Sequence, residues 1–276
     1  MPTSDWGDWL PNAIAEATPS TTTIWYLGCN GAVLKGSNGT TLFIDPYLGT
    51  GDPPRTVRMI PVPFNPEDVV DADAILATHE HSDHVHRETK VPIMEETNAK
   101  MYAPPASLDV TDEESWLEHG ELTEEQFGLV ESGDTITVGE FTIHIERAHD
   151  PDATDPVGYV IEHESGTFFH GGDARPSEYF TEIGEKYDID LGMLAFGSRG
   201  MILDKQTREP KETKWYNDEN EVIKAANQLQ LDRLLPSHWD MWRGLTADPT
   251  ALHEHASSFK YPRSLDIARI GDTIEL

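Results

Sequence analysis

Three histidines and an aspartate fall within the short segment Thr78-His79-Glu80-His81-Ser82-Asp83-His84. Imidazole nitrogens and carboxylate oxygens are ligands that zinc and manganese ions take in proteins. In an extended chain His79 and His81 point to the same side, while Asp83 and His84 can turn toward a second position. A polar surface loop rich in histidine is the alternative, but the spacing His-x-His-x-Asp-His is specific. The segment predicts a site for one or two divalent ions, Mn²⁺ or Zn²⁺.

Further candidate ligands follow other apolar runs of the chain. Residues 74–77 are all apolar and predict a buried strand, which places the histidine segment on the loop at its carboxyl end. A rigid sheet holds side chains on such loops while the backbone stays free to turn. His149, Asp173 and His238 also come directly after strand-like runs. Each alone would more often be a surface residue, but their shared position at strand ends makes them candidate ligands.

The strand-like runs fall into two groups that are separated in the sequence. One group lies within residues 24–103 and the other within residues 135–235. Helical patterns are expected at residues 5–18, 112–128, 177–186, 218–230 and after residue 248. Two sheets covered by helices on both outer faces fit this order, so we expect an α/β fold, a four-layer αββα sandwich. No linker or internal repeat divides the chain, and we expect a single domain over residues 1–276. The segment 46–66, with six prolines, predicts an irregular loop near the site.

The composition excludes several classes of partner. Fifty acidic residues face twenty basic ones, giving a formal net charge of −30. Such a field repels nucleic acid and anionic membranes, while seven tryptophans and regular apolar runs argue against disorder. We interpret the acidity as a halophilic surface, and expect the melting temperature to rise from dilute buffer to molar KCl. No signal peptide or membrane span is evident and Cys29 is the only cysteine, so we expect a cytoplasmic protein.

The order of the candidate ligands resembles the metallo-β-lactamase fold, in which a His-x-His-x-Asp-His motif precedes a His, a Gly-Asp and a late His. By that resemblance one ion would be held by His79, His81 and His149. The other would be held by Asp83, His84 and His238, and Asp173 would bridge the two ions.

A narrower resemblance, to the L-ascorbate-6-phosphate lactonase family, covers most of the chain. The segments that carry it are residues 5–10, 24–31, 45–47, 49–51, 75–79, 169–173, Arg199-Gly200 with Asp204-Lys205, and 237–242. The lactonases are longer, need no histidine at the position of His149, and have Asn-Pro-Arg-Gly where this chain has Gly197-Ser198-Arg199-Gly200. These departures surround the pocket and leave the substrate open.

The expected activity is metal-dependent hydrolysis of a small, phosphorylated or neutral sugar lactone. Two ions that share a water would lower its pKa and supply a hydroxide that attacks the carbonyl. Asp83 or Asp173 would orient the nucleophile and pass on its proton, and His238 would contact the developing charge. Arg199 and Lys205 would hold a phosphate or carboxylate of the substrate, or else be surface cations. The resemblance favours manganese, although ligands without a thiolate do not decide against zinc.

Two other functions are weighed against the lactonase. A phosphodiesterase acting on a small phosphodiester is the enzyme alternative, because one fold and site can serve both chemistries. A metal-binding or sensing protein without turnover is the alternative from another class, and the complete set of candidate ligands argues against it. The expected partner is a small-molecule substrate, and the sequence leaves a homo-oligomer open.

Overall fold

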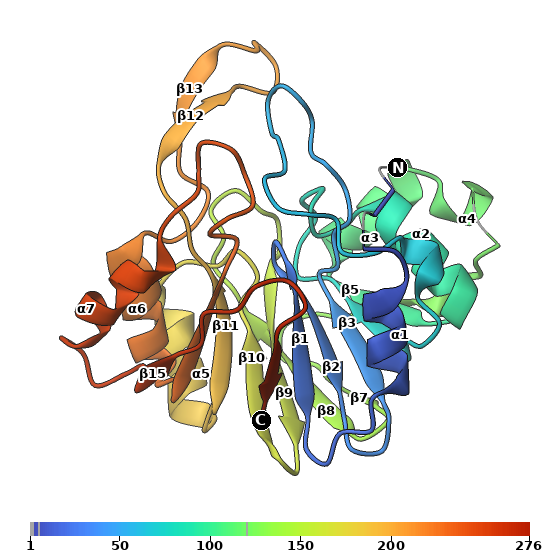
Figure 1. The fold of residues 1–276 in the computed structure, drawn as a ribbon, viewed down its shortest axis with the longest axis horizontal. Helices are drawn as coiled ribbons and strands as arrows, with labels where there is room; N and C mark the ends of the chain where they lie inside the picture. The colour runs from blue at the N-terminus through green and yellow to red at the C-terminus, as the bar shows by residue number, and fades with distance from the viewer. Residues whose placement is uncertain (1–2, 5, 120) are drawn as a thin grey trace.

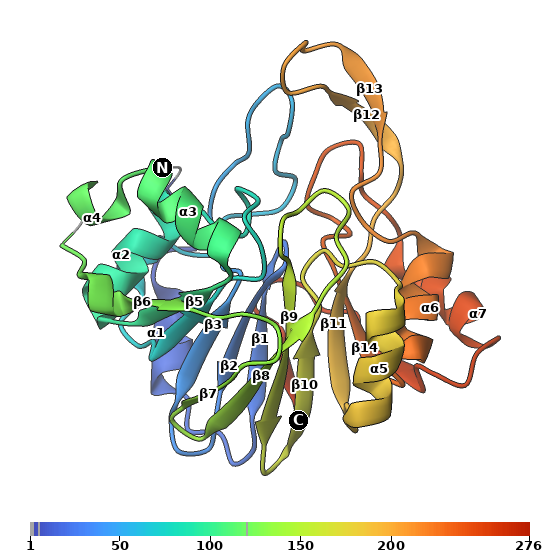
Figure 2. The same cartoon turned by 180° about the vertical axis from the view of Figure 1, so that it is seen from behind.

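Two β-sheets packed face to face form the centre of the protein, and helices cover the outer face of each sheet (Figure 1; Figure 2). The structure is a computed structural model, and it describes residues 3–4, 6–119 and 121–276. Asp5, the first residue of the N-terminal segment that resembles the lactonases, lies outside the described residues. No helix in the described part of the chain is long and apolar enough to span a membrane.

The first sheet has seven strands in the order β16-β1-β2-β3-β4-β5-β6. They are β1 (Thr23–Gly28), β2 (Gly31–Lys35), β3 (Thr41–Ile44), β4 (Ala74–Leu76), β5 (Lys100–Ala103), β6 (Phe127–Leu129) and β16 (Thr273–Glu275). Strands β1 to β3 form an antiparallel meander, whereas β3 to β6 run parallel to one another. The parallel strands end at one edge, so the segment after β4 starts beside the end of β3.

The second sheet repeats this plan with the order β15-β14-β11-β10-β9-β8-β7. Its strands are β7 (Thr135–Val138), β8 (Phe141–Arg147), β9 (Val157–His163), β10 (Gly166–His170), β11 (Leu191–Ala195), β14 (Arg233–Ser237) and β15 (Ser264–Leu265). Strands β7 to β10 are antiparallel neighbours, and β10, β11, β14 and β15 are parallel. The carboxyl ends of β10 and β14 therefore lie at the same edge of this sheet.

Helices form the two outer layers. On the first sheet lie α1 (Trp9–Glu16), α2 (Arg87–Thr97), α3 (Pro105–Glu113) and α4 (Trp116–His119), with the short helices η1 (Pro66–Asp68) and η2 (Glu124–Gln126). On the second sheet lie α5 (Glu178–Lys186), α6 (Glu219–Gln228), α7 (Leu252–Ala256) and η3 (Pro249–Ala251). Helix α6 begins with a capping box in which Asp218 and Glu221 satisfy each other's backbone N–H groups.

Strand β1 shows how the sequence builds the layers. Ile24 and Tyr26 belong to the apolar core between the two sheets, whereas Trp25 and Leu27 belong to the core between the first sheet and its helices. Successive side chains of a strand point to opposite faces, so a strand buried on both faces is apolar throughout. A third core lies between the second sheet and α5, α6 and α7. These layers confirm the predicted αββα sandwich.

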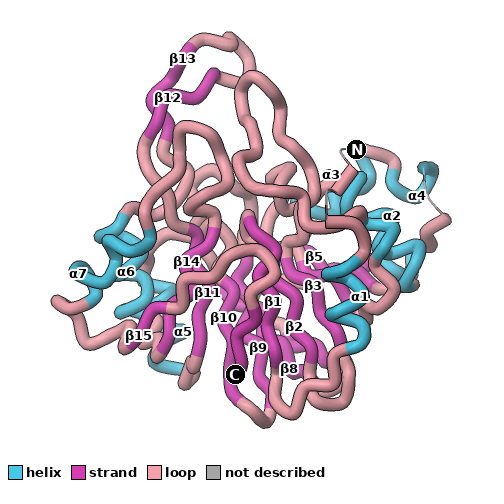
Figure 3. Tube along the Cα trace, viewed as in Figure 1, coloured by secondary structure: helices cyan, strands magenta, loops and turns pink. Residues whose placement is uncertain are grey.

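Two irregular segments stand above the carboxyl ends of the strands. The proline-rich loop after β3 lies beside the hairpin of β12 (Gly200–Leu203) and β13 (Pro210–Thr213), as Figure 3 shows. Arg58 donates hydrogen bonds to the carbonyl oxygens of Tyr47, Gly49, Ile60 and Pro61 and thereby fixes the path of the loop. The hairpin and the loop are joined by Arg208 and Asp52, whose side chains are 2.8 Å apart.

Candidate metal centre

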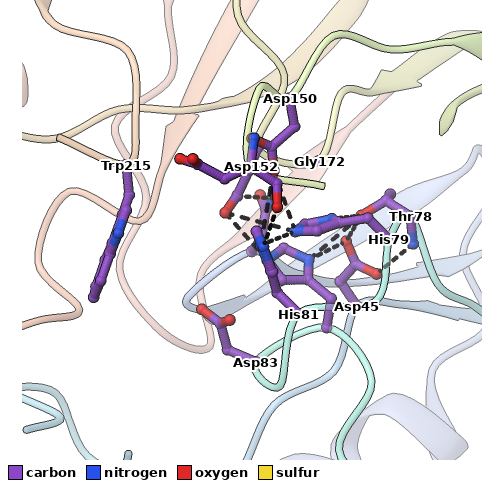
Figure 4. A network of polar contacts seen from close by, with 12 residues as sticks. Asp45, Thr78, His79, His81, Asp83, Asp150, Asp152, Gly172 and Trp215 are labelled. Carbon is purple, nitrogen blue, oxygen red and sulfur yellow. Dashed lines mark hydrogen bonds and ion pairs between the residues drawn. The ribbon is translucent and has the colours of Figure 1, made fainter. Parts of the chain in front are cut away.

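Side chains from the ends of five strands meet at one place, at the edge where both sheets end (Figure 4). Asp45 follows β3, the histidine segment follows β4, Asp150 follows β8, Asp173 follows β10, and His238 follows β14. Three groups offer ligand atoms that all lie within 4.8 Å of one another: His79, His81, Asp150 and Asp173; His84, Asp173 and His238; and Cys29, Asp83 and His238. Residues shared between the groups make them one continuous cluster.

Asp173 connects the two halves of the cluster. Its Oδ2 lies 3.9 Å from His79 Nε2 and 3.4 Å from His84 Nε2, while its Oδ1 lies 3.2 Å from His238 Nε2. The carboxylate thus presents one oxygen to the histidines after β4 and the other to the histidine after β14. This arrangement suits a ligand that bridges two positions.

Two buried polar atoms in the cluster form no hydrogen bond within the described part of the protein. His84 Nε2 and Asp150 Oδ2 are both inaccessible and form no hydrogen bond. Buried polar groups are almost always paired, because an unpaired one costs about 1–3 kcal/mol. Asp150 Oδ2 lies 3.7 Å from both His79 Nε2 and His81 Nδ1, a spacing that leaves space for an ion between them. The donor set and its unpaired atoms therefore fit divalent metal ions.

A buried carboxylate below the cluster orients the histidines. Asp45 accepts hydrogen bonds from the Thr78 backbone N–H at 2.9 Å, from the Thr78 hydroxyl at 2.6 Å and from His84 Nδ1 at 2.7 Å. Because Thr78 gives its proton to Asp45, its oxygen can accept the Nδ1 hydrogen of His79 at 2.9 Å. Both imidazoles are thereby left with Nε2 facing the cluster, and a metal-ligating histidine commonly has such a partner on its other nitrogen.

Burial and neighbouring charges shift the pKa values of these groups in different directions. Burial, with His84 close by, lowers the pKa of His79 well below its usual range, so its imidazole is neutral and able to ligate a metal. Burial also raises the pKa of Asp45, but the charge and hydrogen bond of His84 outweigh it and the net pKa is lowered. Burial and the neighbouring Asp173 raise the pKa of Asp150 to about 6.

A cavity of about 690 Å³ opens beside the cluster. Its wall is formed by residues of the histidine segment, the proline-rich loop, the helical segment around residue 113 and the β12–β13 hairpin: Tyr47, Gly51, Asp52, Arg55, Thr56, Glu80, His81, Ser82, Asp83, Val85, His86, Val110, Glu113, Glu114, Asp150, Asp152, Asp173, Lys205, Trp215, Tyr216 and Trp242. A volume in this range accommodates one small molecule.

Comparison with known families decides the classification. The family model described as the beta-lactamase superfamily domain matches residues 40–239, which include most of both sheets and every residue of the cluster except Cys29. The chain belongs to the beta-lactamase superfamily. It is accordingly a hydrolase of this superfamily, and the metallo-β-lactamase fold expected from the sequence is confirmed.

Relatives and solved structures agree with this membership. The chain is 26% identical to proteins named probable L-ascorbate-6-phosphate lactonase UlaG from Salmonella heidelberg (strain SL476) and Escherichia coli (strain SMS-3-5), over 89% of this chain and 77% of theirs. Igni18, a metallo hydrolase from Ignicoccus hospitalis, has a TM-score of 0.66 at 19% identity and covers 93% of this chain and 99% of its own. A possible metal-dependent hydrolase from Veillonella parvula has a TM-score of 0.67 at 15% identity, with the same coverage.

The structure of this superfamily member brings together six of the seven ligands predicted from the sequence, namely His79, His81, Asp83, His84, Asp173 and His238. It does not bring His149 among them. His149 is exposed, whereas its neighbour Asp150 is buried and faces the histidines. Ala148 packs into the core beyond β8, so the next side chain points outward and the one after it returns inward. The structure thus places Asp150, in place of His149, beside the histidines, and His149 as a ligand stays an untested prediction.

The two predicted substrate cations have different positions. Lys205 lines the cavity, as expected. The Arg199 side chain is 61% exposed, lies 3.8 Å from Glu212, and is absent from the cavity wall. Of the two alternatives considered for Arg199, this position favours the surface cation.

Cys29, the only cysteine of the sequence, was not among the candidate site residues, yet it lies at the cluster. Its Sγ is buried, 3.8 Å from Asp83 Oδ2 and 3.7 Å from both ring nitrogens of His238. Cys29, Asp45 and His238 all have positive φ angles, of 56°, 43° and 62°. Such strained backbone in residues other than glycine is concentrated at functional sites. One sequence signal could have identified Asp45 and Asp150 as site residues. Each follows the end of a strand, as the histidines of the cluster do.

Proposed function

We propose that this hydrolase is a metal-dependent lactonase acting on a small sugar lactone that carries one anionic group. The observation that carries the proposal is the cavity itself, which has Asp83, Asp150 and Asp173 of the cluster on one wall and room for a single small molecule. Relatives named probable L-ascorbate-6-phosphate lactonase, which match most of the chain, support the same substrate class.

We assign two metal positions. One is formed by His79, His81, Asp150 and Asp173, and the other by Asp83, His84, Asp173 and His238. When bound, the ions act as Lewis acids that polarise the substrate carbonyl and lower the pKa of water. Three carboxylates among seven ligands are hard oxygen donors, which favour manganese more than a set of histidines and thiolates would. The metal is therefore assigned as Mn²⁺, with Zn²⁺ as the alternative.

The chain's own residues handle the proton. Hydrolysis adds water to the lactone carbonyl, breaks the ring C–O bond, and leaves an alcohol and a carboxylic acid, which releases its proton to solvent. Asp83, whose side chain is 15% exposed to the cavity, receives the proton from the attacking water and returns it to the ring oxygen. Asp173 is more deeply buried, and its carboxylate lies between His84 and His238 and helps to hold their positions. His238 is held by ring stacking on Tyr216, with ring centroids 4.2 Å apart, which fixes the direction of its Nε2 toward Asp173.

The charges around the cavity weigh against the phosphodiesterase alternative. Five carboxylates besides those of the proposed metal ligands line the wall: Asp52, Glu80, Glu113, Glu114 and Asp152. They face only two cations among the described lining residues, Arg55 and Lys205. A phosphodiester places its own charge on the metals and needs further cations along the groove, whereas a lactone places a neutral carbonyl there. The open cavity likewise favours turnover over a purely metal-binding role.

A panel of substrates tests the proposal. Manganese-loaded and zinc-loaded protein should hydrolyse neutral and phosphorylated sugar lactones, measured by acid release at constant pH. His84→Ala should lower the rate about 100-fold or more, because it removes a ligand held by Asp45. His253→Ala, on the exposed side of α7, is the matched control and should behave as wild type. Robust cleavage of bis-aryl phosphodiesters without activity on any lactone would reverse the assignment.

A further inference from the structure

Few of the cations near the site are free to meet a substrate. The guanidinium of Arg58 donates hydrogen bonds to four carbonyl oxygens of the loop, and Arg175 donates to the carbonyl oxygens of Lys214 and Trp215. Among the described residues that line the cavity, the cations are Arg55 and Lys205. No ion pair with a protein carboxylate is found for either of them in the described part of the chain.

Arg55 is held in place without using its hydrogen-bond donors. Its guanidinium carbon lies 5.3 Å from the centre of the Trp215 ring, a cation–π contact across the gap between loop and hairpin. Its Nε is buried and has no acceptor. Stacking fixes the plane of a guanidinium and leaves its N–H groups pointing outward at the edge, where they match the two oxygens of a phosphate or carboxylate. A buried donor without a partner indicates that a ligand supplies the acceptor.

We propose that Arg55, stacked on Trp215 and assisted by Lys205, is the subsite that receives the anionic group of the substrate. The inference rests on the proposed function and makes it more specific: the substrate has a carbonyl at the metal cluster and a phosphate or carboxylate at the other end. Figure 4 shows Trp215 on the opposite side of the site from His79, and the Asp83 carboxylate points toward the side where Trp215 lies. Apart from Arg55 and Lys205, the Asp and Glu side chains carry the charge on the described cavity wall. An anionic group is therefore favoured beside these two cations.

Lys205 approaches from a separate segment. It lies in the turn between β12 and β13, is exposed, and lines the cavity. The contact of Arg208 with Asp52 holds this hairpin against the loop that carries Arg55. The two cations thus come from segments about 150 residues apart in the chain, which the fold places together. Arginine supplies the directional contact and lysine a mobile point charge.

Binding of three probes tests the subsite independently of turnover. Manganese-loaded protein is titrated calorimetrically with gluconate, with 6-phosphogluconate, which adds a phosphate, and with glucarate, which adds a second carboxylate. Arg55→Ala should lower the affinity for 6-phosphogluconate or for glucarate by about tenfold or more, and the affinity for gluconate by less than twofold. The probe that loses more identifies the group as phosphate or carboxylate. Arg55→Lys should recover only part of the loss, because it lacks the planar fork.

Controls separate the subsite from general effects. Arg263→Ala removes one exposed arginine far from the cavity and should leave the binding of all three probes unchanged. Thermal melts and metal content of each variant show that it is folded and loaded. Equal weakening of the binding of gluconate and of the two probes with a second anionic group in Arg55→Ala would overturn the proposal. So would unchanged binding, or a selective loss in Arg199→Ala in place of Arg55→Ala.

Kinetics then separate this proposal from the proposed function. Arg55→Ala should raise KM for a phosphorylated or carboxylated lactone and leave kcat near the wild-type value, since the contact is made in the ground state. If wild type hydrolyses no lactone but binds 6-phosphogluconate or glucarate through Arg55, the lactonase fails and the anion subsite stands. If wild type hydrolyses lactones and Arg55→Ala leaves KM unchanged, the subsite fails and the lactonase stands.

Discussion

Replacement of Asp150 by Asn tests the proposed metal centre most directly. The change keeps the size of the side chain but removes its negative charge. Asp150 Oδ2 is buried, lies 3.7 Å from both His79 Nε2 and His81 Nδ1, and has no hydrogen-bond partner. In the absence of an ion this carboxylate is an energetic cost, and with an ion between these three atoms it becomes a charged ligand.

Asp150→Asn is expected to stabilise the metal-free protein and to weaken its binding of metal. Burial and the nearby Asp173 raise the pKa of Asp150 to about 6, so the charged form is disfavoured in the metal-free protein. Asn removes that cost, and the metal-free variant should melt at a higher temperature than metal-free wild type. Loss of one charged interaction worth about 1.5–3 kcal/mol should weaken Mn²⁺ binding at this position by roughly 10- to 150-fold. The stabilisation gained on adding metal should shrink accordingly.

The assay uses protein stripped with a chelator, then titrated with Mn²⁺ by calorimetry and followed by thermal melting. His149→Ala is the matched control, because it changes the adjacent residue whose side chain is exposed. Its affinity should stay within about twofold of wild type, as expected for a surface substitution. Wild-type affinity in Asp150→Asn, or an equal loss in His149→Ala, would refute the assignment of Asp150 as the ligand.

Two further predictions concern Gly172, which lies beside the site, and Glu140, which lies at the opposite edge of the second sheet. Gly172→Ala should destabilise the protein by about 1–3 kcal/mol and lower its metal content, since φ is +55° and the new Cβ would lie 2.7 Å from Thr78 Oγ1; wild-type denaturation and metal content would contradict this. Glu140→Gln should destabilise by about 1–2 kcal/mol at neutral pH. Hydrogen bonds from His163 Nε2 and the Asn38 N–H outweigh burial and lower the pKa of Glu140. That stability is present above the unfolded pKa and is lost as pH falls through the folded one. The melting temperatures of wild type and Glu140→Gln should therefore converge as the pH is lowered. A difference in melting temperature that stays constant with pH would contradict the explanation.

The large-scale fold was readable from the sequence because its strands are continuous apolar runs. The second predicted group of strands, within residues 135–235, contains β8 (Phe141–Arg147), and the predicted helix at 177–186 corresponds to α5 (Glu178–Lys186). Helix α2 was missed because it contains Pro92 and buries Lys90, which together weaken its apolar periodicity. The short strands β12, β13, β15 and β16 were missed for another reason: strands of two to four residues are defined by their pairing partners.

The sequence by itself determined the chemistry of the site. A His-x-His-x-Asp-His segment after an apolar strand, with Asp173 and His238 after later strands, specifies the donor types, and parallel strand ends must meet at one edge. Only the tertiary structure decided which neighbour points inward, Asp150 or His149, because one residue of turn beyond a strand reverses the direction of a side chain. It also decided which cations reach the cavity. Loops and hairpins take their path from contacts made far away in the sequence, and no local pattern encodes that path.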